Sequence, residues 1–266
     1  LPGTTDNELF FSIDGKTQIN PKGDEIIASI NAKTGKLDPQ SENKQSTITA
    51  TLCYPYKTTL STTVCIDTDV AGTRPGKKVC NVKELVVNNG QGAPIAVTRI
   101  EPQMIPVVGK DTSTENAVIK PQFLIFVENK GRGNPVNINN YHNVCGRFDF
   151  DSDDQKNKDE IRNIWNVAFI RAYTTGKEIA QKTEDEKKGV QLICCTNIDG
   201  KCPESAIGNI EGFIRFRDRK DWVRCTFKDG IPRNIDAYTS PLRIEIDYGY
   251  VQSISTNFFI QKPLKY

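Results

Sequence analysis

The sequence predicts an all-β protein that is cross-linked by disulfides. Three observations indicate this fold class: short apolar runs separated by Gly-, Pro- and Asn-rich turns, an even number of cysteines, and a repeated strand motif. The 266 residues carry a formal net charge of +2. Such a balanced charge gives no strong field, so neither a nucleic-acid partner nor a membrane-surface partner is expected.

The repeated motif occurs near both ends of the chain, as ITATLCYPYKTTLSTTVCI (48–66) and LRIEIDYGYVQSISTNFFI (242–260). Apolar residues alternate on either side of a Tyr-x-Tyr centre, so each copy predicts a strand, a tight connection and a returning strand. The tyrosines are expected to hydrogen-bond to the backbone at a sandwich corner, the alternative being an aromatic ligand surface. Four tyrosines align in one register: Tyr54 with Tyr248, and Tyr56 with Tyr250.

The repeat predicts two units that each end in the same hairpin. The first is a short β unit over residues 1–72, followed by a linker over 73–92. Its earlier strands are expected at Glu8–Ile13 and Glu25–Asn31, which gives fewer strands than the roughly seven of a complete sandwich. We therefore expect this unit to be completed by strand exchange.

The second predicted unit covers residues 93–266 and is fuller. Short strands separated by turn residues at such spacing are typical of an immunoglobulin-like β-sandwich. Insertions are expected near 134–166, with a short helical or irregular segment, and near 176–189, where the sequence is highly charged. The expected strands before the closing hairpin are Ala93–Ile100, Phe123–Glu128, Val167–Thr174, Val190–Cys194, Gly212–Phe216 and Trp222–Phe227.

The even number of cysteines predicts disulfides. No pair has the short spacing that a zinc site needs. We expect a loop closed by Cys65 and Cys80, and another from the adjacent Cys194 and Cys195 to Cys202, with the remaining connectivity open. The eight cysteines are Cys53, Cys65, Cys80, Cys145, Cys194, Cys195, Cys202 and Cys225.

Disulfides also indicate an extracellular, cell-surface location. The first residue is Leu1 and the single methionine is Met104, which predicts a chain matured by removal of a signal peptide, the alternative being a trimmed chain. No apolar run reaches the roughly 18 residues of a membrane span. Asn-x-Ser/Thr sequons are absent, so N-linked glycans are not expected.

A family resemblance supports the same fold class. The segment Ala93–Val136, with GAPIAVTRIEP and KPQFLIFVENKGRGNPV, resembles the opening strands of adhesion-type immunoglobulin-like (CARDB-like) domains of archaeal and bacterial surface proteins. The closing LRIEIDYGYVQSISTNFFI, preceded by the strand WVRC, resembles the end of such domains in archaeal secreted proteins. The resemblance implies a cell-surface or filament role, and it carries over no catalytic residues.

The sequence offers no catalytic residues, and we expect a protein that is not an enzyme and has no cofactor. His142, the only histidine, lies in an Asn-rich segment without a nucleophile motif nearby, so it is expected to be an ordinary loop residue. No glycine-rich phosphate loop is present. A secreted hydrolase using paired carboxylates such as Asp151 or Asp153 with Glu160 is a weaker alternative, because acidic pairs are common.

One acidic segment has calcium-loop spacing, which predicts a structural Ca²⁺ site. Its oxygen ligands alternate and end in a late Glu, as a hard cation requires. Asp154 stands where such loops have glycine, so a solvated acidic loop is the alternative. The candidate ligands are Asp149, Asp151, Asp153, Asn157 and Glu160.

Basic residues alternate with Ile214 and Phe216 along a predicted strand pair, and these two apolar side chains are expected to point inward. The basic side chains then form either a patch for acidic glycans or carboxylates, or a charged edge that prevents unwanted strand pairing. Trp222 between them is expected in the core, or else as a partly exposed anchor. The basic residues are Arg215, Arg217, Arg219, Lys220 and Arg224.

These observations predict a structural subunit of a cell-surface assembly or filament, whose partners are copies of itself. A strand donated near the N-terminus would complete the sandwich of a neighbouring copy. The alternative is a monomeric adhesion or glycan-binding module. The predicted interface residues are Glu8, Leu9, Phe10, Phe11, Ser12 and Ile13.

Overall fold

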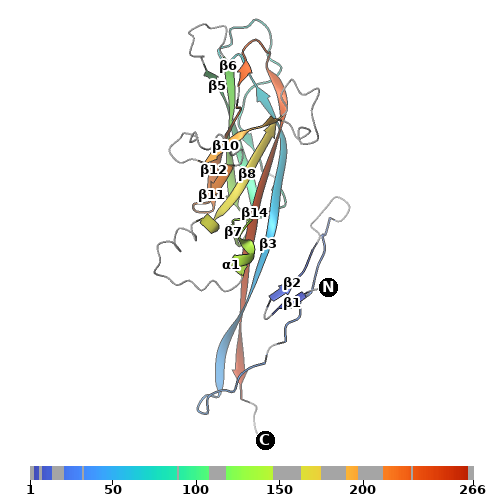
Figure 1. The fold of residues 1–266 in the computed structure, drawn as a ribbon, viewed down its shortest axis with the longest axis vertical. Coiled ribbons are helices and arrows are strands. Elements are labelled where there is room, and N and C mark those ends of the chain that lie inside the picture. Colours follow the sequence, from blue (N-terminus) through green and yellow to red (C-terminus); the bar gives the residue numbers. More distant parts are fainter. Residues whose placement is uncertain are drawn as a thin grey trace. The chain divides into compact units, whose positions relative to one another are not determined.

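The computed structural model describes residues 3–5, 8–13, 21–31, 33–88, 90–107, 118–145, 163–174, 190–196, 212–228 and 230–262 (Figure 1). Its contacts divide the chain into two compact units. The main unit is Thr49–Ser255, and the terminal unit combines Leu1–Ile48 with Thr256–Tyr266. Residues 49–72 therefore belong to the same compact unit as residues 93–255.

Nearly all of the regular structure is β-strand, as the alternating apolar pattern predicts. In chain order the described elements are β1 (Gly3–Thr5), β2 (Glu8–Phe10), β3 (Asn43–Ile66), β4 (Leu85–Val86), β5 (Ile95–Val107), β6 (Val118–Asn129), β7 (Asn134–Val136), α1 (Tyr141–Cys145), β8 (Val167–Thr174), β9 (Val190–Gln191), β10 (Ile193–Thr196), β11 (Gly212–Arg215), β12 (Lys220–Thr226), β13 (Ile231–Pro232) and β14 (Tyr238–Gln261).

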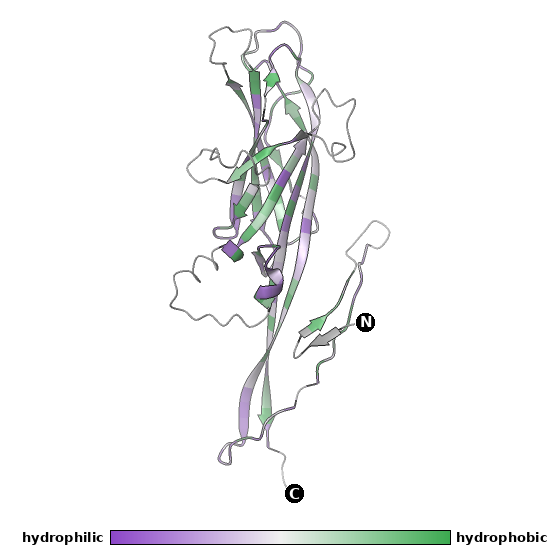
Figure 2. Cartoon of the chain, viewed as in Figure 1, coloured by the Kyte–Doolittle hydropathy of each residue, from purple (hydrophilic) through white to green (hydrophobic). Residues whose placement is uncertain are grey.

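Two antiparallel sheets build the main unit. One has the order β10-β12-β6-β5-β4 with β13 beside β6, and the other has the order β11-β8-β14-β3 with β7 beside β14 and β9 beside β8. Hydrophobic segments, green in Figure 2, recur along the strands of both sheets. One core cluster takes side chains from both, including Phe123 of β6, Ile170 of β8 and Ile246 of β14. The predicted all-β, disulfide-bonded fold is confirmed, with two sheets around one core.

The predicted strands of the main unit occur close to their expected positions, but those before residue 43 do not. Val167–Thr174 is β8 with the predicted ends, whereas β5 runs on to Val107. Glu8–Ile13 is a strand only over Glu8–Phe10, where β2 pairs with β1. Residues 25–31 are described and belong to no strand, so the predicted strand there is wrong for the single chain.

The predicted hairpins of the repeat are also wrong, because each copy lies within one uninterrupted strand. β3 and β14 have 24 residues each and are neighbours in one sheet. Pro55 is accommodated because β3 is an edge strand, where a missing N–H need not break the ladder. Gly249 is required because an added Cβ would lie 2.4 Å from Cβ of Tyr141. Pro and Gly commonly form turns, but here Pro55 lies in an edge strand and Gly249 allows Tyr141 to pack closely against β14.

Three disulfides join pairs of described residues in the main unit. Cys65–Cys80 closes a loop as predicted. Cys53–Cys145 joins β3 to α1, and Cys194–Cys225 joins directly opposed residues of β10 and β12. Cys194 therefore does not pair with Cys202; Cys195 is also disulfide-bonded, and Cys202 lies outside the described residues. In the described part of the chain, no helix is long and apolar enough to cross a membrane.

Candidate functional site

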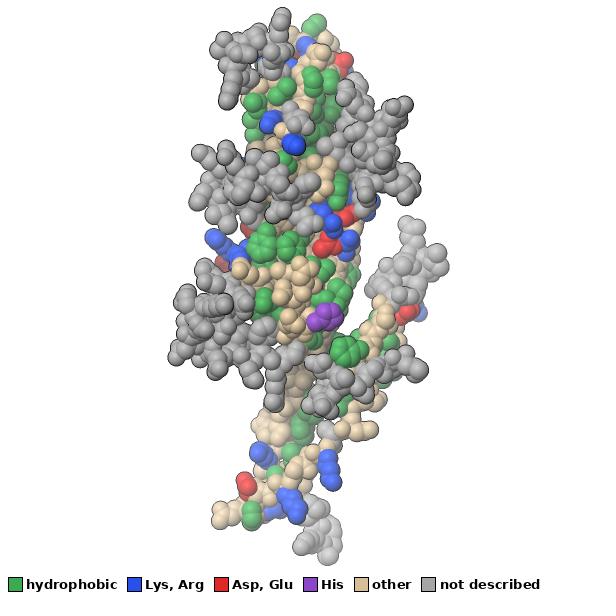
Figure 3. Space-filling view, viewed as in Figure 1, with side chains coloured by type: hydrophobic (Ala, Val, Ile, Leu, Met, Phe, Trp, Pro, Cys, Tyr) green, Lys and Arg blue, Asp and Glu red, His purple; other side chains and the backbone are tan. Residues whose placement is uncertain are grey.

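Large apolar side chains of the terminal unit lie at the surface. Ile27 is 87% exposed and Ile30 is 72% exposed. Both clusters of packed core side chains found in the described residues belong to the main unit. Hydrophobic side chains are accordingly visible among polar ones on the face drawn in Figure 3. The exposed apolar residues of the terminal unit are Phe10, Phe11, Ile13, Ile26, Ile27, Ile30, Ile48 and Phe259.

The two sides of β3 and β14 differ in chemistry where these strands cross into the terminal unit. On one side, cross-strand hydroxyl pairs form a ladder, with Thr51 to Ser253 at 2.9 Å and Thr49 to Ser255 at 2.8 Å. The other side continues the core-facing row of even-numbered residues, because side chains alternate along a strand. There, Ile254 is 58% exposed. This apolar stretch lies on the core-facing side but is not buried.

β3 is also the last strand of its sheet. Among the described strands its only neighbour is β14, so its other edge presents unpaired N–H and C=O groups. A long open edge is a template for pairing with a further strand. The open edge of β3 and the exposed apolar segments of the terminal unit are the main candidate interaction surfaces.

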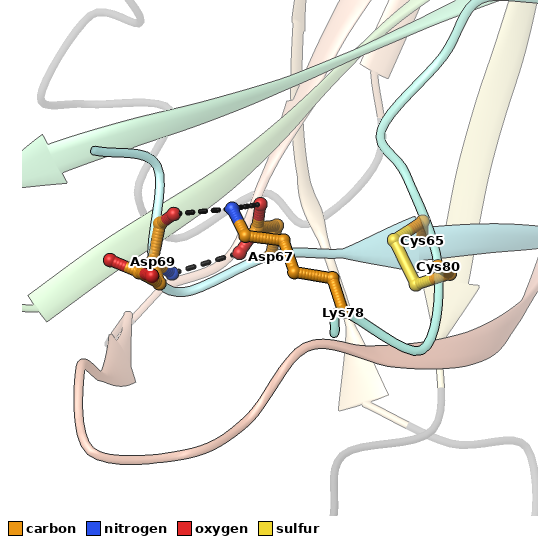
Figure 4. Close-up of a disulfide and its surroundings, with 5 residues drawn as sticks. All are labelled: Cys65, Asp67, Asp69, Lys78 and Cys80. Atoms are coloured by element: carbon orange, nitrogen blue, oxygen red, sulfur yellow. Dashed lines mark hydrogen bonds and ion pairs between the residues drawn. A yellow bond between two sulfur atoms is a disulfide. The ribbon is translucent and has the colours of Figure 1, made fainter. Parts of the chain in front are cut away.

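The loop closed by Cys65–Cys80 is fixed by a charged clamp (Figure 4). The Lys78 ammonium donates to Oδ2 of Asp67 and to the carbonyl oxygen of Asp69, both at 2.6 Å. The Asp69 carboxylate accepts the N–H groups of Thr73 at 2.9 Å and Arg74 at 3.0 Å. Arg74 in turn donates to the carbonyl of Ile235 at 2.7 Å. The clamp therefore holds the loop against the connection that leads to β14.

We expect this clamp to weaken in acid. The N–H groups of Arg74 and then Thr73, which donate to its carboxylate, lower the pKa of Asp69 to about 2. Because this value lies below the roughly 3.9 of an unfolded Asp, ionised Asp69 stabilises the fold above about pH 4, and the stabilisation is lost as the pH falls towards 2. Differential scanning calorimetry across this range should show a Tm that falls less steeply for Asp69→Asn.

Asp236 supplies the control for this prediction. Its side chain is 92% exposed and contacts the same Arg74 at 3.3 Å. An exposed pair of this kind contributes little, so Asp236→Asn should keep the wild-type pH dependence. Equal slopes for wild type and Asp69→Asn would contradict the assignment of the acid transition to Asp69.

The four repeated tyrosines meet across β3 and β14 inside the main unit. The Tyr54 and Tyr250 rings are 5.8 Å apart and the Tyr56 and Tyr248 rings are 5.9 Å apart. The Tyr248 hydroxyl accepts the N–H of Ile95, and burial raises the pKa of Tyr248. The other backbone partners are the N–H of Gly133 for Tyr250 and the carbonyl of Gly92 for Tyr56. Tyr56, Tyr248 and Tyr250 thus bond to the backbone as predicted, although in the middle of strands and not at a corner.

The predicted basic patch is divided between the two sheets. Ile214 and Phe216 are buried as expected. Arg215 lies on β11 in one sheet and Arg224 on β12 in the other, so the predicted basic residues do not share one strand pair of a single sheet. The reason is that the chain changes sheets between β11 and β12. At this crossing, Arg219 has a positive φ and donates to the carbonyl oxygens of residues 129 and 131.

A small aromatic and basic cluster lies on the outer side of the sheet that contains β5, β6 and β12. Phe126 is only partly buried, because its neighbours along β6 take the core side. The Arg99 guanidinium lies 3.8 Å from the centre of the Phe126 ring, and the Trp222 ring centre is 6.3 Å from it. Trp222 is therefore a partly exposed residue of the outer face and not a core residue.

The sequence reasoning missed a buried carboxylate on the other sheet. Glu245 is 4% exposed and lies within 4.0 Å of Arg243, Arg171 and Lys57. Asp247 pairs with the same Lys57 at 3.3 Å and with Arg171. These ion pairs connect β3, β14 and β8. The alternation of acidic and apolar residues in LRIEIDYGY indicates that the carboxylates lie on one side of a strand, but it does not identify the basic residues that pair with them.

The remaining predicted sites are not tested by this geometry. Asp149, Asp151, Asp153, Asn157 and Glu160 lie outside the described residues, so the calcium site stays a prediction. His142 is exposed on α1 with its ring 3.8 Å from that of Tyr141. Comparisons with family models, curated proteins and solved structures find no match for this chain.

Proposed function

We propose that the protein is an immunoglobulin-like structural subunit of an extracellular assembly or filament that self-associates through β-strand pairing. The observation that carries the proposal is the exposure of the large apolar side chains of the terminal unit. Large apolar side chains exposed in such number are unfavourable in water and are typical of interaction surfaces. A chain that assembles with copies of itself would bury them.

Strand pairing is favoured over side-chain contact alone because β3 has an open edge. The predicted donor Glu8–Ile13 is partly paired, since β2 lies beside β1. Phe11 and Ile13 follow that strand and are 41% and 45% exposed. Phe10, within β2, is also 53% exposed, so all three side chains offer apolar surface to a partner.

An extracellular location fits the covalent structure. The three disulfides persist in oxidising compartments and are uncommon in the cytosol. A subunit exposed outside a cell benefits from cross-links that restrain its unfolded chain. No catalytic role is part of the proposal.

Deletion of residues 1–14 tests the role of the predicted donor. We expect the shortened chain to keep the fold of the main unit, because the core clusters lie beyond residue 48, and to lose its polymers. Electron microscopy and light scattering measure the assembly, and far-ultraviolet circular dichroism checks the fold. Oligomers that survive the deletion would show that this segment does not drive assembly.

A monomeric adhesion or glycan-binding module is the second candidate. It is favoured by the cluster of Arg99, Phe126 and Trp222, because exposed aromatic and Arg side chains are frequent at binding sites. This candidate predicts a single species near 29.7 kDa in native material. Long particles in electron micrographs would reject it.

A further inference from the structure

The segment Glu25–Asn31 has a strand-forming sequence but forms no strand in the single chain. It is described in full, and it belongs to none of the strands or sheets. Its three isoleucines are 44%, 87% and 72% exposed, in the order Ile26, Ile27 and Ile30. The sequence EIIASIN has high strand propensity, yet no strand among the described residues pairs with it.

This segment repeats the pattern of the exposed part of β3. Residues 26–30 read IIASI and residues 48–52 read ITATL, so both have the spacing Ile-x-Ala-x-Ile/Leu with a hydroxyl residue after Ala. In a strand, Ile26, Ala28 and Ile30 lie on one side, and Ile27 and Ser29 lie on the other. An added strand of this sequence would continue the apolar row of β3, and its Ser29 would continue the hydroxyl row, whereas Ile27 stands where β3 has Thr49. Its apolar face therefore matches the sheet that it would extend.

The exposed part of β3 has both features that an added strand requires. Its outer edge has no neighbour among the described strands. On its core-facing side, Ile48 is 47% exposed and Leu52 is 37% exposed, and Ile254 of the adjacent β14 is 58% exposed. Backbone hydrogen bonds would provide affinity there and the apolar row would provide register.

We propose that Glu25–Asn31 of one copy adds as a strand to the open edge of β3, around Leu52, of a second copy. This inference rests on the proposed function and adds a second segment to it. Glu8–Phe10 already has β1 as a partner, whereas none of the seven residues Glu25–Asn31 pairs with another strand in the part of the chain that the structure describes, and in extended form they would span about 23 Å. Because donor and acceptor are different surfaces, each copy offers one of each, and the contact propagates into a chain of copies.

Two full-length variants test the two halves of the contact by size-exclusion chromatography with light scattering. Ile26→Asp/Ile30→Asp places carboxylates in the apolar row of the donor, and Leu52→Asp does so in the acceptor. Each variant alone should associate at least tenfold more weakly than wild type, because a buried unpaired carboxylate is unfavourable. A mixture should form a 1:1 complex and nothing larger, since it contains one intact donor and one intact acceptor.

Matched controls place the charge on the opposite side of each strand. Ile27→Asp and Thr51→Asp should still assemble, because those side chains lie away from the apolar row. Circular dichroism checks that each variant is folded, and Ile48→Asp replaces Leu52→Asp as the acceptor variant if the latter unfolds.

The outcomes separate this inference from the proposed function. A wild-type protein that stays monomeric rejects both. Assembly by wild type and equally by Ile26→Asp/Ile30→Asp rejects the donor while self-association stands. If each variant is monomeric and the mixture forms no 1:1 complex, the segment does not bridge two copies and the inference is overturned.

Discussion

Removing the Cys53–Cys145 disulfide with Cys53→Ala/Cys145→Ala should lower the free energy of unfolding by about 4.5 kcal/mol. The bond joins residues 92 positions apart, so in the oxidised protein it restrains a large part of the unfolded chain. In the folded protein it attaches α1 to β3 beside a small cluster that contains Val136, Val144 and Val251. Urea unfolding followed by tryptophan fluorescence measures the loss.

Cys65→Ala/Cys80→Ala is the matched comparison. Its disulfide spans only 15 positions, which gives an expected loss of about 3 kcal/mol from the same chain-entropy argument. Both double variants remove one cross-link and two sulfur atoms. A larger loss for the short loop would contradict loop entropy as the source and would point to the adjacent clamp of Lys78 and Asp67.

Tyr248→Ala should destabilise the protein by about 3–5 kcal/mol, because the variant replaces a large buried ring by a cavity. Tyr248 is fully buried and stacks on Tyr56. Its hydroxyl also pairs with the Thr58 hydroxyl at 3.1 Å and accepts the N–H of Ile95 at 3.3 Å. The ring thus connects β14 to β3 and to the start of β5 in the opposite sheet.

Tyr248→Phe separates the ring from the hydroxyl. It should cost about 1–2 kcal/mol, because it leaves the Ile95 N–H and the Thr58 hydroxyl without this partner. The difference between the alanine and phenylalanine variants then measures the packing of the ring. Two equal losses in urea unfolding would mean that the polar contacts, and not the packing, dominate at this position.

Local patterns predicted the strands of the main unit well. Val167–Thr174 has apolar residues at alternate positions and several β-branched residues. The two-residue periodicity and the strand propensity therefore agree, and β8 has the expected ends. Cys65 and Cys80 are close in sequence, so their pairing needed little knowledge of the fold. The alternation of apolar and polar residues alone predicts that Ile214 and Phe216 point inward, and both are buried.

Long-range pairing could not be predicted in this way. Pro55 and Gly249 are residue types that favour turns. Only the three-dimensional neighbours of each strand show that Pro55 lies in an edge strand and that Gly249 packs against Tyr141. Cys194 pairs with Cys225 because β10 and β12 are in register, which no local spacing encodes. The open edge of β3, now the main candidate surface, is likewise a property of the sheet order.

The tyrosine contacts between the two occurrences of the repeated motif should give the protein a characteristic circular dichroism signal. Four tyrosine rings form a continuous group, with centres 5.8–6.2 Å apart between neighbours. Electronic transitions of chromophores at such separations couple, so this group should dominate the tyrosine region of the near-ultraviolet circular dichroism spectrum. That band will report whether β3 and β14 remain paired during unfolding or assembly, without any label.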